Sequence, residues 1–358
     1  MSFKCGIIGL PNVGKSTLFN ILTSSQIPAK NFPFCTINPN FGLAPVFDDR
    51  LNQISKIVLP KNIVTTFIEF VDIAGLVKGA SQGLGLGNQF LSNIKNTDVI
   101  IHVVRCFEDD SIFHVHDIFD PVNDVDIVNM ELILSDLQLC EKEILKLKKN
   151  KIGVNENKMN VLNFCLENLK NNVMLNKLDL KNIELHEICN IGFITIKPIM
   201  YIANISNDVK KNRFLDKFIN FTTSSQDICL PIKILQSSTK KYIKIHSVNH
   251  VNLIKNNNCE VNDIITNGYR LLNLHNFFTV GKKEVRSWTI KRNTTNFDAA
   301  KKIHTDIQKG FIRAQIIGYN DFIHYKGFNR SREFGKLRFE GKNYIIQDGD
   351  IINFLFNV

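Results

Sequence analysis

The sequence predicts an α/β protein built on a mostly parallel sheet, with a helical insertion and a smaller α+β domain at its carboxyl end. Apolar, β-branched runs alternate with helix-forming stretches, which is the rhythm of a parallel sheet. The character of the chain becomes charged and helix-forming at Asp126, and it changes to short alternating strands near His275. The apolar runs are Cys5 to Leu10, Thr65 to Val71, Val99 to Cys106 and Pro198 to Ala203.

The first apolar run leads directly into a phosphate-loop pattern. Residues 9–17 read Gly-Leu-Pro-Asn-Val-Gly-Lys-Ser-Thr and match G-x-x-x-x-G-K-[ST]. Gly9 and Gly14 allow positive φ, so successive N–H groups can turn inward around an anion. The helix expected from Ser16 to Leu22 adds its N-terminal dipole to that attraction. The pattern therefore predicts a site for nucleotide phosphates.

The residues of this loop have separate predicted roles. Lys15 supplies positive charge to the β- and γ-phosphates and is a catalytic candidate, and the Ser16 hydroxyl is placed to ligate Mg2+. We expect Thr17 at the α-phosphate, because it lies on the same first helical turn. Asn12 is either an ordinary loop residue or a ligand for K+ at the phosphates. Val13 and Gly14 complete the expected binding set with their backbone.

A D-x-x-G motif ends the Thr65 to Val71 run, as Asp72-Ile73-Ala74-Gly75. Asp72 is expected to act on Mg2+ through water, and the Gly75 N–H to sense the γ-phosphate. The motif is common on its own, but here it lies at a strand end, where ligands of open α/β sheets collect. The glycine-rich stretch that follows is expected to order and release with nucleotide state.

The region from Asp126 to about Asn190 predicts an antiparallel helical hairpin. Apolar side chains recur at three-and-four spacing on two arms, which are separated by a turn near Gly153. We expect the arms to pack as a short coiled coil, and the alternative is two ordinary surface helices of the main domain. The predicted stripes are Ile127, Met130, Leu134, Leu137 and Ile144 on the first arm, and Met159, Leu162, Leu166 and Leu169 on the second.

The region from His275 to Val358 predicts a separate α+β domain with one helix from Asn296 to Lys309. Asp348-Gly349 lies between two apolar runs and predicts a hairpin turn. This region holds 15 Lys plus Arg and 8 Asp plus Glu, so it contributes 15 − 8 = +7 of the net charge of +10. The excess favours a polyanionic partner such as RNA, and the alternative is compositional drift in a chain rich in Lys throughout.

Composition excludes several classes of protein. The chain has 358 residues and 44% apolar content, which suits a globular protein of two or three domains. No apolar run approaches the ~18 residues needed to cross a bilayer and no signal-peptide segment follows Met1, so we expect a cytoplasmic protein. The eight cysteines lie at least 24 residues apart, which predicts neither a zinc site nor a disulfide framework. No membrane or DNA partner is predicted.

Several long stretches resemble the YchF family of Obg-like ATPases, a group of TRAFAC-class P-loop NTPases. The resemblance implies a G-domain over residues 1–125 and 191–274, a coiled-coil insertion over 126–190 and a TGS domain of β-grasp form over 275–358. It also implies a ribosome-associated ATPase in which Ser16 and Thr36 bind Mg2+. The stretches are residues 9–17, 31–36, 70–80, 85–90, 284–290, 302–306, 309–314 and 353–358.

The choice of base is left open by residues 204–207. Guanine-specific relatives carry N-K-x-D there, whereas this chain has Asn204-Ile205-Ser206-Asn207 and therefore lacks the guanine clamp. The family has N-x-x-E and prefers ATP, and Asn207 departs from it. An amide can both donate and accept, so discrimination is expected to be weaker. ATP is the expected substrate and GTP the alternative, with Asn204 and the Ile205 backbone expected at the base by the resemblance.

The hydrolytic residue is not obvious from the motifs. Leu76 follows the D-x-x-G motif where relatives often carry Gln, and its alkyl side chain cannot orient water. The resemblance points instead to His114, for which a solvated loop histidine is the alternative reading. We expect a slow Mg2+-dependent ATPase whose nucleotide state controls association with the ribosome, through the large subunit or ribosomal RNA. The alternative is a ribosome- or RNA-binding module with nucleotide as a conformational ligand only.

Overall fold

The computed structural model describes residues 3–23, 40–73, 86–109, 119–149, 156–205, 212–234 and 259–357. It confirms the predicted α/β class. The chain divides into two compact units. The phosphate-loop unit contains residues 4–42 and 70–264, and the C-terminal unit contains residues 1–3, 43–69 and 265–358. The domain boundaries expected from the sequence stay a prediction, and residues 43–69 group with the carboxyl end of the chain.

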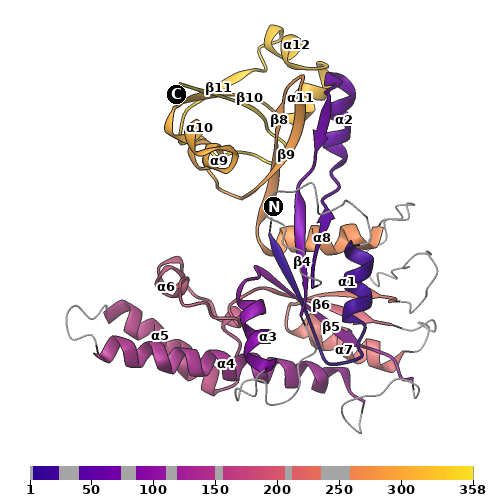
Figure 1. Cartoon of the computed structure of the whole chain (residues 1–358), viewed down its shortest axis with the longest axis vertical. Helices are drawn as coiled ribbons and strands as arrows, with labels where there is room; N and C mark the ends of the chain where they lie inside the picture. Colours follow the sequence, from indigo (N-terminus) through magenta and orange to yellow (C-terminus); the bar gives the residue numbers. More distant parts are fainter. Residues whose placement is uncertain are drawn as a thin grey trace. The chain divides into compact units, whose positions relative to one another are not determined.

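A six-stranded sheet carries the phosphate loop, with the strand order β2-β4-β1-β5-β6-β7 (Figure 1). The strands β1, β5, β6 and β7 pair in parallel, and every residue of β5 and β6 is buried. Burial on both faces is why these runs are continuously apolar rather than alternating. The strands are β1 (Lys4–Ile8), β2 (Phe41–Pro45), β4 (Phe67–Asp72), β5 (Val99–Arg105), β6 (Ile199–Asn204) and β7 (Ile228–Ile232).

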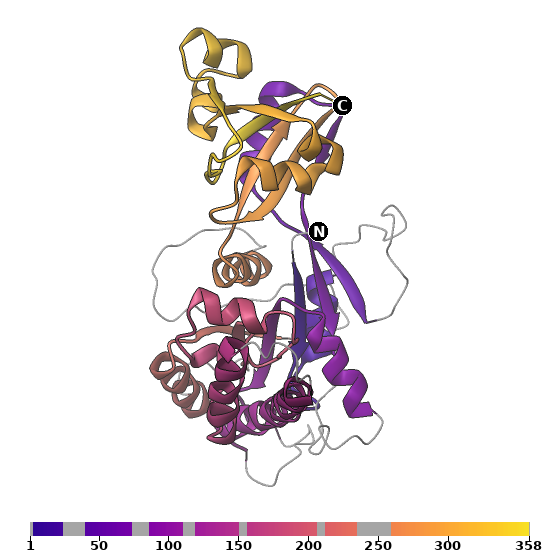
Figure 2. The ribbon, with the colours of Figure 1, turned by 90° about the vertical axis from the view of Figure 1, so that its left-hand side faces the viewer.

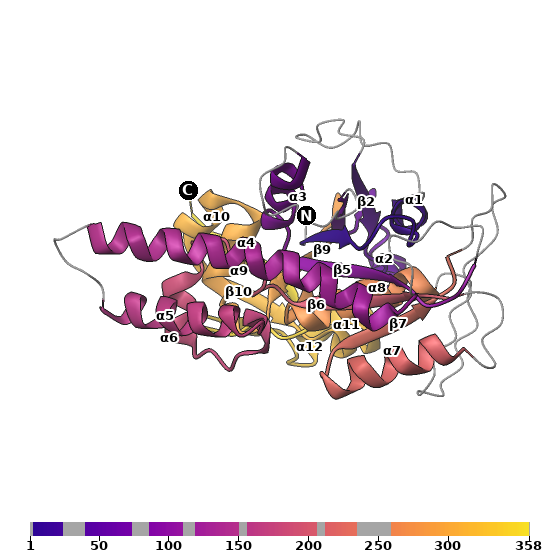
Figure 3. The same cartoon turned by 90° about the horizontal axis from the view of Figure 1, so that it is seen from below.

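Helices cover both sides of the parallel strands. Figure 3 shows α1 (Lys15–Thr23) and α3 (Leu86–Lys95) on one side of β5 and β6, and α7 (Arg213–Ser224) on the other. The amphipathic α7 turns Leu215, Phe218 and Thr222 toward the sheet. Besides the helical insertion, the described part of the unit also holds the short η3 (Leu175–Lys177), α6 (Asn182–Ile188) and the start of α8 (Cys259–Leu271).

The helical insertion is a hairpin of α4 (Pro121–Lys149) and α5 (Glu156–Lys170), which contact each other (Figure 1). The predicted stripe on the first arm was wrong in phase, because Met130 is 39% exposed and Ile127, Leu134 and Leu137 are only half-buried. The face that is buried includes polar residues, which an apolar pattern cannot reveal. Its members are Asp124, Val125, Val128, Glu131, Leu132, Ile133, Ser135, Asp136, Cys140 and Ile144.

Asp136 anchors α4 to the chain that leads into β6. Its buried carboxylate accepts hydrogen bonds from the Ile194 N–H at 2.9 Å and from the Thr195 N–H and hydroxyl, both at 2.7 Å. Burial raises the pKa of Asp136, and these donors oppose that shift. A carboxylate satisfied by so many donors fixes the position of the helix relative to the sheet.

The C-terminal unit is built on a second sheet, with the order β11-β10-β12-β8-β9-β3. The helices α9 and α10 pack on one face and α2, α11 and α12 on the other, and Figure 2 shows α9 and α10 (orange) and α2 (purple) on opposite sides. The strands are β3 (Asn62–Val64), β8 (Leu274–Val280), β9 (Glu284–Lys291), β10 (Phe311–Ile317), β11 (Arg338–Glu340) and β12 (Ile351–Phe356). The helices are α2 (Asp49–Val58), α9 (Asn296–Ile303), α10 (Thr305–Lys309), α11 (Tyr319–His324) and α12 (Phe328–Glu333).

Two sequence predictions for this unit are wrong in detail. The helix expected from Asn296 to Lys309 is interrupted at His304, which is extended and whose Nδ1 accepts from the Asp306 N–H as the cap of α10. The hairpin expected at Asp348-Gly349 does not form, because residues 344–347 make no strand and only Ile345 bridges to Thr295. Gly349 instead takes a φ of +89° in a turn that leads into β12.

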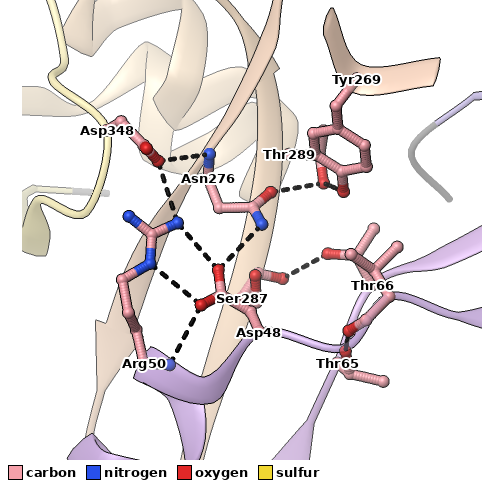
Figure 4. A network of polar contacts seen from close by, with 10 residues as sticks. Asp48, Arg50, Thr65, Thr66, Tyr269, Asn276, Ser287, Thr289 and Asp348 are labelled. Atoms are coloured by element: carbon pink, nitrogen blue, oxygen red, sulfur yellow. Dashed lines mark hydrogen bonds and ion pairs between the residues drawn. The ribbon is translucent and has the colours of Figure 1, made fainter. Parts of the chain in front are cut away.

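Residues 43–69 are tied to the C-terminal sheet by apolar and polar contacts. Strand β3 extends the sheet by pairing in parallel with β9, and α2 buries Leu51 and Ile54 against it. Figure 4 shows the polar part: the Arg50 guanidinium pairs with Asp48 at 2.9 Å and with Asp348 at 3.0 Å. Asn276 donates to Asp48 at 3.2 Å. This segment lies between the two nucleotide motifs in sequence, so its place was not predictable from either.

Across the described ranges, none of the helices has the length and apolar character that crossing a membrane requires.

Candidate nucleotide-binding site

The loop after β1 adopts the backbone expected of a phosphate loop. Gly9 and Gly14 have φ values of +146° and +102°, which confirms the need for glycine at both positions. A Cβ on Gly9 would lie 2.4 Å from the Val103 carbonyl oxygen, so the loop runs in direct contact with β5. Asn12 is left-handed as well, at +61°, which the sequence analysis missed. Its residue type was the available signal, because Asn tolerates that region best after glycine.

Lys15 is held inside this loop. Its side chain is 7% exposed, and its ammonium group donates to the Leu10 carbonyl oxygen at 2.7 Å. Burial lowers the pKa of Lys15 to about 8, while the charge of Asp72 acts in the opposite direction. The ammonium therefore stays largely charged at neutral pH. It is desolvated, so an entering phosphate meets a cation with little water to displace.

Asp72 and Ser16 supply oxygen atoms beside this lysine. The Asp72 N–H donates to the Asn40 carbonyl oxygen at 2.9 Å, which places the residue at the end of β4. Its Oδ1 is buried and has no hydrogen-bond partner among the described residues. Ser16 is exposed and Thr17 half-buried on the first turn of α1. A buried carboxylate oxygen and an exposed hydroxyl are hard donors that suit Mg2+ and its bound water.

Asn204 clamps the phosphate loop to the segment after β7. Its Nδ2 donates to the Val13 carbonyl oxygen at 2.9 Å, and its Oδ1 accepts from the Ile234 N–H at 3.2 Å. The Ile205 N–H donates to the Ile232 carbonyl oxygen at 3.0 Å, and its side chain is buried. The Asn204 amide is thus engaged by the protein itself. The expectation that Asn204 and Ile205 line the base pocket stays a prediction.

His102 is a buried histidine in β5, next to the loop. Its side chain is 1% exposed, and burial together with the charge of Lys15 lowers its pKa to about 3. The ring therefore stays neutral at physiological pH and cannot act as a charged group. Nothing in the local sequence marks this residue as a neighbour of Lys15.

Three predicted site residues, Thr36, Gly75 and His114, lie outside the described residues, as do Leu76 and Asn207. Arg105 holds both described ends of the segment that carries His114. Its guanidinium donates to the carbonyl oxygens of Phe107 at 3.0 Å and Asp109 at 2.9 Å. It also lies 5.4 Å from the Phe119 ring centroid. A single arginine at a strand end gave no sequence signal for this role.

Residues 4–130 match a family model described as a 50S ribosome-binding GTPase, and residues 274–357 match the model YchF-GTPase_C, described as a protein of unknown function. The chain is 52% identical to the "Ribosome-binding ATPase YchF" of Buchnera aphidicola, and 48% identical to the protein of the same name in Escherichia coli O157:H7, over 100% of both chains in each case.

A solved structure gives a similar result. The Schizosaccharomyces pombe protein described as a YchF GTPase aligns with a TM-score of 0.81 and 33% identity. The alignment covers 99% of this chain and 98% of that one. The arrangement of sheets and helices is therefore shared over nearly the whole length.

Proposed function

Because this chain belongs to the YchF family, we propose that it is a Mg2+-dependent ATPase that hydrolyses ATP slowly and uses nucleotide state to control its association with the ribosome. Family membership makes the chain a P-loop nucleoside triphosphatase. The slow rate, the metal and the control by nucleotide state are the proposal.

One observation carries the phosphate chemistry. The buried Lys15 ammonium is folded back onto its own loop at 2.7 Å from the Leu10 carbonyl oxygen, with the unpartnered Asp72 oxygen buried at the adjacent strand end. A cation and a carboxylate oxygen held in this way interact strongly with a metal-bound triphosphate, because the Lys15 ammonium and the Asp72 Oδ1 are both buried. Lys15 then stabilises the charge that develops on the γ-phosphate, and the backbone of residues 12–14 orients the phosphates.

Ser16 and Asp72 are the described residues that fit Mg2+, Ser16 directly and Asp72 through water, and the resemblance adds Thr36. When bound, the ion neutralises charge on the β- and γ-phosphates. Asn12 has a left-handed backbone within the phosphate loop, and K+ bound beside it at the phosphates is part of the proposal. His114 remains the proposed residue for orienting water.

ATP is the proposed substrate and GTP the alternative. The curated relatives are named ATPases, whereas the fission yeast protein is described as a GTPase. The absence of Lys and Asp at positions 205 and 207 supports ATP, since the guanine clamp cannot form. Competition of ATP and GTP against a fluorescent ATP analogue tests this: at least tenfold preference for ATP is expected, and equal competition contradicts it.

Association with the ribosome is proposed from the names of the relatives and from the charge of the C-terminal region. That region carries +7, and counterion release makes such an excess favour RNA. The large subunit is the proposed target, in line with the description of the matched GTPase model. The proposed ribosome-bound role implies a cytoplasmic location, which is part of the same proposal.

The decisive experiment compares wild type with Lys15→Ala, and with Lys170→Ala as an exposed-lysine control in the same unit and outside the basic C-terminal region. We expect Lys15→Ala to lower ATP turnover at least about 100-fold and to remove any effect of ATP on ribosome cosedimentation. If wild type binds ribosomes equally well with ATP, with ADP and without nucleotide, nucleotide state does not control ribosome binding and the proposal is contradicted. Ribosome binding without any Lys15-dependent turnover supports the binding-module alternative, which Leu76 favours.

A further inference from the structure

The C-terminal sheet has one face that is covered only in part. Near Phe278, Ile317 and Ile351 this face is closed by α2, α11 and α12. Farther along β10, β11 and β12 the same face is open to solvent. Side chains alternate along a strand, and directly paired residues share a face, so its members follow from the register. Gln315 pairs with Phe339 of β11 on one side and with Asn353 of β12 on the other.

This open face therefore presents a row of Phe339, Gln315 and Asn353 across three strands, with Arg313 and its partner Leu355 in the next row. We name these five residues the open row. Phe339 is 50% exposed, Arg313 and Asn353 are exposed, and Gln315 and Leu355 are half-buried. The strands that carry them lie at the β11 edge of the C-terminal sheet (Figure 1).

Arg313 and Phe339 form a stacked pair in which the charge of Arg313 is not neutralised by a described carboxylate. The guanidinium carbon lies 4.4 Å from the centroid of the Phe339 ring. Within the part of the chain that the structure describes, Arg313 has no ion-pair partner. By contrast, Arg338 on the opposite face pairs with Glu340 at 3.6 Å and with Asp350 at 3.7 Å. The open row thus offers a flat cation that no carboxylate neutralises.

The two amides of the open row keep further capacity for hydrogen bonds. Asn353 Nδ2 donates to Gln315 Oε1 at 2.9 Å. Among the described residues this is their one side-chain hydrogen bond, so Gln315 Nε2 and Asn353 Oδ1 face solvent with a donor and an acceptor free. An aromatic ring, a guanidinium plane and a free amide pair stand within about 10 Å across three strands.

We propose that the open row binds unpaired bases of single-stranded RNA, about two of them, at the point where the protein meets the ribosome. Bases stack on Phe339 and on the Arg313 guanidinium, their edges bond to Gln315 and Asn353, and a phosphate pairs with Arg313. Duplex RNA is excluded as the occupant, because its bases are stacked within the helix and cannot reach a flat sheet face. The +7 charge of residues 275–358 supports a polyanion over an apolar peptide. The proposal rests on the ribosome association proposed above.

The test measures fluorescence anisotropy of a labelled eight-nucleotide RNA of mixed sequence with the full-length protein, at two salt concentrations. We expect Phe339→Ala to weaken binding about tenfold and Phe339→Trp to retain it, because stacking needs only a π-face. Arg313→Ala is expected to weaken binding by a similar factor. Two matched controls are expected to change binding less than twofold: Phe334→Ala, another exposed phenylalanine of the same unit, and Arg286→Ala, a stacked arginine beside Trp288.

The outcomes separate this proposal from the ribosome proposal. RNA affinity that is unchanged in Phe339→Ala and Arg313→Ala overturns the open row as a site, even if ribosomes still bind. Equal binding of a duplex of the same sequence overturns it too, since simple charge attraction would then suffice. Loss of ribosome binding in Phe339→Ala with unchanged RNA affinity assigns the row to a protein partner instead. Stacking-dependent RNA binding without ribosome binding supports the row and contradicts the ribosome proposal.

Discussion

The two sheets of this protein place their functional groups in different ways. In the phosphate-loop sheet, β5 and β6 are buried at every position, and the polar groups that line the site, such as Asn204, lie where the strands end. In the C-terminal sheet, β9 alternates between buried and partly exposed residues, and β10 leaves Ile312 and Arg313 exposed at a bulge between buried neighbours. A sheet covered on both faces confines chemistry to its edge, whereas a half-covered sheet can use its face.

The difference extends to electrostatics and to tolerance of change. Lys15 and the Oδ1 atom of Asp72 are buried, so the attraction between these groups is weakly screened by salt. Arg313 is exposed, and its contribution to binding a polyanion should fall as salt is added. We therefore expect small structural changes to abolish nucleotide binding at the phosphate loop. Binding of a polyanion at Arg313 should instead weaken gradually.

The largest expected effect is on the free energy of unfolding, at Asp136, which joins α4 to the chain before β6. Asp136→Ala leaves the Ile194 and Thr195 N–H groups without their acceptor in a buried place. We expect the free energy of unfolding to fall by about 3 kcal/mol, measured by urea denaturation followed by circular dichroism. Asp136→Asn, which keeps one acceptor oxygen, should lose less. A loss below about 1 kcal/mol for Asp136→Ala would show that these bonds are not what fixes α4.

The next largest expected effect is on nucleotide affinity, through the backbone of the phosphate loop. In Gly9→Ala the new methyl group would lie 2.4 Å from the Val103 carbonyl oxygen, at a φ of +146°. Affinity for a fluorescent ATP analogue should fall at least about 100-fold, equivalent to about 2.7 kcal/mol. Gly281→Ala is the control, because a Cβ there would meet its nearest atom at 3.6 Å. An affinity within threefold of wild type would mean that the loop can shift away from β5.

A smaller effect concerns the polar network of the C-terminal unit (Figure 4). Burial opposes ionisation of Asp48, but hydrogen bonds from Arg50 and Asn276 and the charge of Arg50 hold its pKa below the ordinary value. Stability from this carboxylate is therefore present above about pH 4, its unfolded pKa, and is lost as pH falls through the lower folded value. Arg50→Met should cost about 1–2 kcal/mol at pH 6, and less as the pH approaches 3.

Unfolding of the C-terminal unit can be followed by the fluorescence of Trp288, because it is the protein's one tryptophan and lies in β9 of that unit. The free energies of unfolding of wild type and Arg50→Met are measured in this way at pH 3 and pH 6. Tyr319→Phe is a milder comparison, since it removes only the hydrogen bond to Gln53. If the difference between Arg50→Met and wild type is the same at pH 3 and pH 6, the Asp48 carboxylate is not the source of the stability.

The smallest effect is a proton linkage at Lys15. Its pKa is lowered to about 8 in the free protein, and a bound phosphate is expected to raise it again. ATP binding should therefore take up almost no proton at pH 7 and approach one proton at about pH 9. Calorimetry in two buffers of different ionisation enthalpy measures this uptake. Equal uptake at both pH values would place the linkage on another group.

Much of the phosphate site was determined by the sequence alone, because local patterns dictate local backbone. The spacing of Gly9, Gly14 and Lys15 is enough to specify a turn that only glycine permits, followed by a helix start. Asp72 was predictable at a strand end, because a buried apolar run of that length reads as a strand. The same kind of reasoning failed at Asp348-Gly349, where the turn signal was real but no strand preceded it.

Tertiary structure alone decided what joins distant parts of the chain. The Asn204 clamp on Val13 links residues 191 positions apart, and Arg50 meets Asp348 across 298 positions. Residues 43–69 belong to the C-terminal unit, although both nucleotide motifs flank them in sequence. The open row exists only because three strands bring Phe339, Gln315 and Asn353 into register. Hydrophobic patterns with a period of two or 3.6 residues show which face of a strand or helix is buried. Which other element covers that face depends on the packing of the whole chain.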